Sequence, residues 1–436
     1  MLNSLSCRCF FHNIRPSRCS FLHVPSRQRT CIMGDHPKFH ANGRINSRFA
    51  MQRSHSYDIT FTGYHNQSRS ASARSRGYHN PESEYVEARK RLEEEKLRRR
   101  LCLMRSFEYT ALGRRLKDKE IGQPRNSVKF SVFSYNVLAQ HLLEEHTYLY
   151  KNANPEALDW DGRSQRILRE FKDSKADVLC LQEVQSDHFD SFYVPNLKRL
   201  GFVGIFKKRT GDKTDGCAIF YRISKFNLAE TISVEYCKPD VKILDRDNIG
   251  LIALLTPKVK PPLAGDVPFI CVATTHLLYN PSRHDIKLAQ LQLLFAELDH
   301  IAFKSSDGQS NAYHPVILTG DFNLTPETSI YRFITGGSLQ YRGLGRGGLM
   351  PSASGVVLEN ELIPAHLKVT DQCQHLHATE KRTTEGGDAG SFGSGQLSHQ
   401  LRLQSVYPHQ LDRKSGACEV TTHQKNWVTV DYIFHK

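Results

Sequence analysis

The chain has 436 residues, of which 39% are hydrophobic, and it has a formal net charge of +14. This length suits one large α/β domain with extensions, or two to three average domains. No apolar run approaches the ~20 residues that a membrane-spanning helix needs, so no membrane span is predicted.

The N-terminal segment 1–82 is rich in Ser, Arg, Asn and His and poor in aliphatic residues, which predicts a disordered basic tail. Residues 1–80 hold twelve Lys and Arg against two Asp, a net +10, so this tail is expected to contact RNA or an anionic membrane surface. The first 34 residues contain no acid and resemble a mitochondrial transit peptide. A mitochondrial location therefore stays open beside a cytoplasmic or nuclear one.

The eleven cysteines form no CxxC pair. Cys180, Cys217 and Cys271 lie inside apolar runs and are expected to be small core residues. This usage is typical of a protein in a reducing compartment.

The segment 84–119 is dominated by Glu, Arg, Lys and Leu, and no Gly or Pro interrupts it before Gly113. It predicts a charged helix with ion pairs between residues four apart; a simple solvated helix is the first interpretation, and a spacer or an arm that contacts RNA is the alternative. The stretch "IGQPRNS" then breaks the pattern. A catalytic domain is expected over 128–436.

Strands and helices alternate in this domain, which predicts an α/β fold. Between about 342 and 400 the alternation gives way to Gly- and Ser-rich sequence, which predicts a flexible insertion. The strands are expected at 129–139, 176–184, 202–209, 216–222, 249–259, 268–279, 315–323 and 426–436, and helices at 163–174 and 286–301.

Polar residues end several of the predicted strands. In α/β sheets functional groups collect at strand ends, and a polar group there is costly unless it is paired or binds something. Any one of these residues alone would be an ordinary capping or turn residue, but together they predict a shared site. They are Asn136, Glu183, His276, Asp321 with Asn323, and Asp431.

Carboxylates and carboxamides are hard oxygen ligands, which suit Mg²⁺ or Mn²⁺. Such a cation stabilises charge on a phosphate, an adjacent Asp activates water, and a His holds a phosphate oxygen. The residues thus indicate a metal-assisted phosphoester hydrolase. Asp321 would aim the water, and Asn323, two residues on, would bind the metal or the phosphate from the same side.

Six motifs in order, "SYNVLA", "LCLQEV", "DGCAIF", "TTHLLYNP", "LTGDFN" and "TVDYIF", resemble those of the endonuclease/exonuclease/phosphatase superfamily. The segments "LDRDNIGL" and "LLYNPSRHDIKLAQLQLL" are similar to those of its Angel-type members, relatives of nocturnin and the poly(A) deadenylases. The resemblance covers about 129–342 and 403–434.

The resemblance implies a two-layered β-sandwich flanked by helices, with Mg²⁺, or alternatively Mn²⁺, at its rim. Glu183 would be the main metal carboxylate, with Asn136 beside it at both the metal and the substrate. His276 would contact the scissile phosphate. Asp321 would position the nucleophilic water, and Asn323 would bind phosphate or metal.

The implied activity is that of an enzyme acting on RNA 3′ ends in mRNA metabolism, with RNA-processing or translation factors as further partners. It is removal of 2′,3′-cyclic phosphate, or 3′–5′ poly(A) exoribonuclease activity as in the deadenylases. A non-catalytic RNA- or partner-binding protein on the same fold is the alternative. A further hypothesis is a hydrolase of DNA or of small phosphoesters. In that case Tyr279 and Arg283 would stack on a nucleotide or clamp it, although Tyr279 equally suits a packing role.

The family pattern ends in a Ser-Asp-His motif on a further strand, and Asp431 would orient a catalytic histidine. Here five residues follow Asp431, and the "SDH" at 186–188 comes too soon after Glu183 to take that place. The expectation is therefore a chain truncated at its C-terminus, with weak or no activity.

Overall fold

The computed structural model describes residues 7–15, 18–21, 86, 89, 128–151, 153, 155–258, 269–306, 311–351, 355–382, 390–407, 420–423 and 427–436. Most of the predicted tail (1–82) and of the predicted charged helix (84–119) lies outside these residues. Within the tail, two strands are described, β1 (Cys7–Arg15) and β2 (Arg18–Phe21). Within the second segment, Val86 and Arg89 are helical.

The first sheet has the strand order β2-β1-β3-β4-β6-β5. Its central strands β3 and β4 are parallel, and the other neighbours are antiparallel. Strand β1 pairs with residues 128–135 of β3, so β3 is not the exposed edge of the sheet. Beyond β1 and β2, the strands of this sheet are β3 (Val128–Asn136), β4 (Val178–Gln185), β5 (Phe202–Lys208) and β6 (Asp215–Arg222).

The second sheet has the strand order β15-β18-β12-β9-β8-β7. It also contains one parallel pair, β9 with β12, among antiparallel neighbours. The strands are β7 (Phe226–Glu235), β8 (Ile249–Pro257), β9 (Ile270–His276), β12 (Val316–Asp321), β15 (Gln404–Ser405) and β18 (Asp431–His435).

Short antiparallel pairs lie outside the two sheets, and each joins strands of only two to four residues. They are β10 (Phe303–Ser306) with β11 (Asn311–Tyr313), β13 (Ser338–Gln340) with β14 (Gln396–Ser398), and β16 (Thr422–His423) with β17 (Trp427–Val428).

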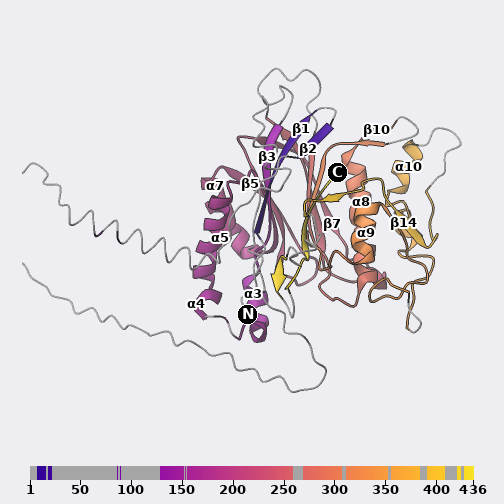
Figure 1. The fold of residues 1–436 in the computed structure, drawn as a ribbon, viewed down its shortest axis with the longest axis horizontal. Coiled ribbons are helices and arrows are strands. Elements are labelled where there is room, and N and C mark those ends of the chain that lie inside the picture. The colour runs from indigo at the N-terminus through magenta and orange to yellow at the C-terminus, as the bar shows by residue number, and fades with distance from the viewer. Residues whose placement is uncertain are drawn as a thin grey trace, which may run out of the picture. The chain divides into compact units, whose positions relative to one another are not determined.

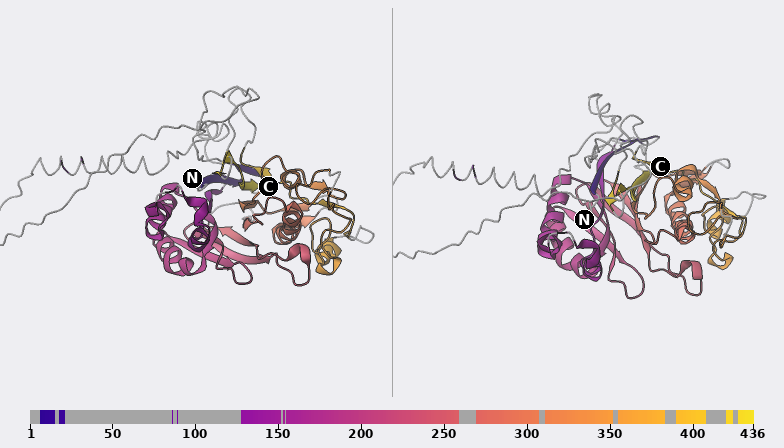
Figure 2. Two further views of the ribbon diagram at one scale, coloured as in Figure 1. Left: turned by 90° about the horizontal axis from the view of Figure 1, so that it is seen from below. Right: turned by 60° about the horizontal axis from the view of Figure 1, so that its bottom comes forward.

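Helices cover the outer faces of both sheets, with α4, α5 and α7 on one side and α8, α9 and α10 on the other (Figure 1). The same layering is visible from two further directions (Figure 2). The helices are α3 (Gln140–Glu145), α4 (Pro155–Leu158), α5 (Trp160–Ser174), α6 (Ser186–His188), α7 (Val194–Arg199), α8 (His284–Ala302), α9 (Ser329–Gly336) and α10 (Leu376–Arg382).

Three apolar layers hold these elements together. Between the sheets, Val132 and Ile219 of the first sheet pack in one buried cluster with Leu251 and Ile317 of the second. Helices α5 and α7 pack on the outer face of the first sheet, and α8 and α9 pack on that of the second. Strands covered on both faces need apolar residues on both, which explains their continuous apolar runs. The predicted α/β fold, a two-layered β-sandwich flanked by helices, is confirmed.

The described part of 342–400 contributes to the core. Leu349, Leu362, Val369 and Leu397 belong to the buried cluster around α8. This layer explains why α8 is buried on nearly all sides instead of along one apolar stripe. These apolar residues are widely spaced in a Gly- and Ser-rich segment, so the sequence does not predict that they are buried. Among the described residues, no helix is long and apolar enough to cross a membrane.

His399 anchors the end of this layer as a neutral imidazole. Its Nε2 lies 2.9 Å from the carbonyl oxygen of Phe333, and its Nδ1 accepts hydrogen bonds from the backbone N–H groups of Leu401 and Arg402. A proton on Nδ1 would remove both acceptor interactions. Burial lowers the pKa of His399 to about 4, although the bond to Phe333 opposes the shift, and Lys436 and Arg402 lower it further.

We therefore expect His399 to make folding stability depend on pH. The pKa of His399 is about 4 in the folded state and about 6.5 unfolded, so the unfolded chain binds the proton more readily. The stabilisation is present above pH 6.5 and is lost as the pH falls towards 4, by about 2 kcal/mol between pH 7 and pH 5. Urea unfolding at both pH values should show a smaller change for His399→Asn; an equal change would contradict this assignment.

Candidate active site

The ends of two parallel strand pairs, one from each sheet, form the candidate site. In the first sheet Asn136 of β3 is in register with Gln182 of β4, one residue before Glu183. In the second sheet His276 of β9 is in register with Asp321 of β12. Parallel strands bring their carboxyl ends to the same edge, so each pair presents its polar residues together.

The carboxamide of Asn136 joins the two sheets at this edge. Its Nδ2 donates to Glu183 Oε1 at 2.8 Å and to Asp321 Oδ2 at 3.1 Å. Its Oδ1 accepts a hydrogen bond of 3.0 Å from the backbone N–H of Leu138. Two carboxylates from different sheets are thus held within reach of one amide group.

The backbone around Glu183 is strained. Glu183 has φ 55°, in the left-handed region, and the pairing of β4 with β6 shifts register between Leu181 and Val184. The other carboxylate oxygen of Glu183 accepts a 3.2 Å bond from the backbone N–H of Ala139. Leu138, which adjoins Ala139, also has a positive φ, 56°. Such strain in residues other than glycine persists where surrounding contacts fix the chain, and it clusters at functional sites.

Asp321 and Asn323 form a tight turn at the end of β12. The backbone N–H of Asn323, whose φ is 51°, donates to Asp321 Oδ1 at 3.0 Å. The Asn323 side chain donates through Nδ2 to the carbonyl oxygen of Leu277, also at 3.0 Å. Leu277 in turn donates its backbone N–H to the Asp321 carbonyl. The turn is therefore fastened to the residue that follows His276, and Asp321 is left only 8% exposed.

His276 lies beside Asp321 on the neighbouring strand. Its Nε2 is 3.9 Å from Asp321 Oδ2. Its buried Nδ1 has no hydrogen-bond partner within the part of the chain that the structure describes. The ring therefore turns Nε2 towards Asp321, whereas Nδ1 stays buried.

The donor set fits a divalent cation of the Mg²⁺ type. Glu183 and Asp321 supply carboxylate oxygens, which Mg²⁺ prefers as ligands, whereas Asn136 turns its Nδ2 towards both acids and its Oδ1 towards the backbone N–H of Leu138. Across the described ranges, no three His, Cys, Asp or Glu side chains are placed to hold a metal ion. Mg²⁺ does not require such a cage, because it keeps several waters and often uses only one or two protein carboxylates.

Asp431 adds a third acid to the rim. It lies directly opposite Asp321 in the antiparallel pairing of β12 with β18, and it is buried. Directly opposite side chains of such a pair point to the same face of the sheet. The Asp431 backbone N–H donates to Thr421 Oγ1 at 3.2 Å. Its expected role of orienting a histidine stays a prediction.

The loop that leads from β9 to α8 carries Tyr279 and Arg283. Their side chains differ in exposure and in whether they are already paired. Tyr279 is 63% exposed. Arg283 instead forms a bidentate pair with the fully buried Asp285, through Nε at 2.9 Å and Nη2 at 3.0 Å. Hydrogen bonding to Asp285 raises the pKa of Arg283. Arg283 is thus bound to an acid of its own chain, which does not favour the predicted phosphate clamp.

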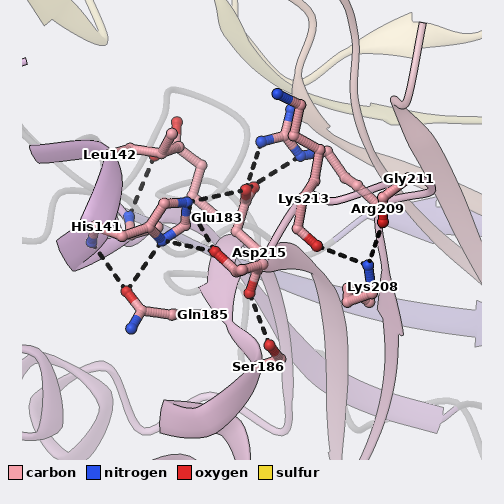
Figure 3. Close-up of polar contacts among 12 residues, drawn as sticks. His141, Leu142, Glu183, Gln185, Ser186, Lys208, Arg209, Gly211, Lys213 and Asp215 are labelled. Atoms are coloured by element: carbon pink, nitrogen blue, oxygen red, sulfur yellow. Dashed lines mark hydrogen bonds and ion pairs between the residues drawn. The ribbon is translucent and has the colours of Figure 1, made fainter. Parts of the chain in front are cut away.

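A polar network beside Glu183 was not foreseen from the sequence (Figure 3). Gln185 Oε1 accepts the backbone N–H of His141 at 3.0 Å, and His141 Nε2 lies 3.0 Å from Thr214 Oγ1. The same His141 nitrogen is 3.6 Å from Asp215, which also pairs with Arg209. Asp215 opens the motif "DGCAIF", which is the one sequence signal for this cluster. The contacts themselves join helix α3, the end of β4 and the start of β6 with the segment before it.

The comparisons with known proteins agree with this architecture. A model of the Endonuclease/Exonuclease/phosphatase family matches residues 133–436. The chain therefore belongs to this family. The predicted resemblance to the endonuclease/exonuclease/phosphatase superfamily is thereby confirmed.

Within the family, the chain is similar to the angel proteins. It is 42% identical to protein angel homolog 2 of Danio rerio over 322 residues, 72% of this chain and 55% of that protein. It is 40% identical to the human homolog 2 over 354 residues, 77% and 64% of the two chains. The chain thus spans roughly three-fifths of the length of these curated relatives.

A solved structure extends this likeness to the fold. It is a crystal structure of ANGEL2, described as a 2′,3′-cyclic phosphatase, in complex with adenosine-2′,3′-vanadate. It is 41% identical in sequence, with a TM-score of 0.61, and the match covers 70% of this chain and 84% of that one. The predicted Angel-type resemblance is confirmed.

If Asn136 joins the sheets as described, Asn136→Leu should lower the free energy of unfolding by about 2–3 kcal/mol, because hydrogen bonds to charged groups are lost. Urea denaturation in metal-free buffer measures this. Asn227→Leu is the matched control, since Asn227 is exposed on β7. Equal stability of the wild type and Asn136→Leu would show that the bridge contributes nothing.

Proposed function

We propose that this chain is a phosphoesterase that acts on RNA 3′ ends and removes 2′,3′-cyclic phosphate with Mg²⁺ or Mn²⁺. The observation that supports it most is the Asn136 carboxamide bonded to both Glu183 and Asp321. Two like charges brought together at a strand edge favour a divalent cation between them. The similarity to ANGEL2, a 2′,3′-cyclic phosphatase, supports the substrate class.

In this proposal Glu183 holds the cation, and Asn136 joins it through Oδ1 once its amide group turns, because the Nδ2 that now faces the acids cannot bind a cation. When bound, the cation supplies charge stabilisation to the phosphate oxygens. Asp321 positions the attacking water, since its carboxylate is fixed by the Asn323 N–H and by Asn136. Asn323 orders this turn, and its carboxamide is the further ligand for phosphate or metal.

His276 contacts a phosphate oxygen of the scissile group. Its Nε2 lies near Asp321, so a phosphate held there is close to the water that Asp321 aims. Asp431 lies opposite Asp321 and would orient a histidine at this rim.

Removal of a 2′,3′-cyclic phosphate takes two hydrolyses. Water first attacks phosphorus, and one of the two ribose ester bonds breaks, which leaves a phosphomonoester and a free hydroxyl. A second water then breaks the remaining ester bond, so that the products are inorganic phosphate and the 2′,3′-diol. Both steps need a positioned water and a stabilised phosphate, and the same residues serve both.

The decisive assay uses three RNAs that end in a 2′,3′-cyclic phosphate, in a 3′-phosphate or in poly(A), each with and without Mg²⁺. We expect metal-dependent loss of phosphate from the first. Glu183→Gln and Asp321→Asn should each lower kcat by about 10²–10³-fold or more, as for removal of one preorganised charged group.

The matched controls are Glu230→Gln and Asp190→Asn, because both side chains are exposed. They should retain wild-type rates. Release of nucleoside 5′-monophosphates from poly(A), with the cyclic end untouched, would replace the proposal with the exonuclease activity. RNA binding without turnover by the wild type on all three substrates would favour a non-catalytic RNA-binding protein.

Tyr279 is proposed as a stacking surface for a base near the RNA end, because its ring is exposed on the loop that follows His276. Tyr279→Ala should raise KM for RNA about tenfold, because stacking on an aromatic ring contributes ~1–3 kcal/mol per base, and it should leave kcat nearly unchanged. Tyr279→Phe keeps the ring and should keep the wild-type KM. If both variants raise KM equally, the hydroxyl group and not the ring contacts the substrate.

A further inference from the structure

Lys287 is a buried lysine that the proposed reaction does not use. It lies in the first half of α8 and is 0% exposed. Lysine is almost never fully buried unless it is paired, because removing the ammonium group from water is costly. Burial lowers the pKa of Lys287 to about 8, and the nearby Asp321 opposes this shift.

The ammonium group holds the turn that contains Asp321. Lys287 Nζ donates to the backbone carbonyl oxygen of Asn323 at 2.8 Å. The N–H of the same Asn323 donates to Asp321 Oδ1 at 3.0 Å. Asn323 has φ 51°, in the left-handed region that asparagine tolerates better than most residues with a side chain, and the Lys287 bond fixes its carbonyl there.

A second polar residue on the same face of α8 holds the neighbouring strand end. Gln290, three residues after Lys287, accepts the backbone N–H of Leu278 at 3.1 Å and donates to Asn248 Oδ1 at 3.2 Å. Asn248 in turn donates to the carbonyl oxygen of His276 at 3.1 Å. Polar side chains of helix α8 thus hold the backbone at the ends of both β9 and β12.

We propose that Lys287 is a positioning residue, which fixes the Asp321–Asn323 turn and thereby the direction in which the Asp321 carboxylate points. This inference rests on the proposed function, because Asp321 is assigned there to aim the attacking water. Lys287 does not touch substrate. It acts through the Asn323 carbonyl and through the favourable field of its charge on Asp321.

A lysine suits this place better than an apolar residue of similar size. A methionine would fill the volume, but it would leave the Asn323 carbonyl without this donor. It would also remove the positive charge that faces the acids of the rim. Burying the ammonium group lowers the folding stability, but its hydrogen bond fixes one conformation of the turn. Buried charges have this effect in some other proteins.

The test compares Lys287→Met with Gln292→Met. Gln292 is also buried on α8 and also donates to a backbone carbonyl, that of Thr370 at 3.1 Å, in the layer formed by 342–400. The control removes the same kind of bond from the same helix without touching the turn. Lys287→Gln, which keeps a donor but not the charge, is the third variant.

The first measurement is hydrogen–deuterium exchange of the segment 319–325, followed by mass spectrometry of the full chain. We expect Lys287→Met to accelerate exchange at Asn323 about tenfold or more, whereas Gln292→Met leaves it unchanged. This readout needs no turnover, so it decides whether Lys287 orders the turn even if the proposed function fails.

The second measurement is steady-state kinetics on RNA that ends in a 2′,3′-cyclic phosphate. Lys287→Met should lower kcat about 10²-fold with KM within about twofold, because a misplaced reacting group slows chemistry more than binding. Lys287→Gln should fall between Lys287→Met and the wild type. An unchanged exchange rate and kcat in Lys287→Met would overturn the proposal. So would loss of the folded state in both Lys287 variants, since Lys287 would then serve the core as a whole.

Discussion

The contact on which the site depends is the Asn136 carboxamide placed between Glu183 and Asp321. Each sheet on its own supplies one carboxylate at the end of a parallel strand pair. Only the stacking of the sheets puts the acids close together, and their mutual repulsion then opposes that stacking. An amide N–H bonded to both offsets part of this repulsion, and a cation at the same place would offset more. Packing of the sandwich and chemistry at its rim are therefore coupled through one side chain.

A polar contact also joins the two sheets below the rim, between the candidate site and the apolar core. Gln182, which is fully buried next to Glu183, donates to Thr274 of the second sheet at 2.8 Å. Thr274 lies two residues before His276. This bond fixes how β4 and β9 lie against each other, and so it limits the sliding of one sheet over the other. Precise placement of strand-end groups requires such a fixed offset, because apolar contacts alone are not directional.

The strand-end positions of the main site residues were predictable from the sequence, because each of them follows an apolar run. Asn136, Glu183, His276 and Asp321 each follow an apolar run, so the sequence itself places them at strand ends. What was not predictable depends on contacts across the fold. Lys287 is a charged residue within a helix, which usually means a solvated face, and nothing local reveals the carbonyl that it meets. The left-handed backbone of Glu183 and Asn323 was hidden for the same reason, since neither is glycine.

The two strained residues and the buried lysine form one physical system. Positive φ costs roughly 1–3 kcal/mol at Glu183 and less at Asn323, because asparagine tolerates the left-handed region. Such strain is kept only where other contacts determine the backbone, and each residue has them: the Ala139 N–H at the Glu183 carboxylate, and Lys287 at the Asn323 carbonyl. The layer formed by 342–400 completes this support, because it packs on α8 from the side opposite the sheet. A segment that the sequence sets apart as an insertion thus bears on the orientation of the acids.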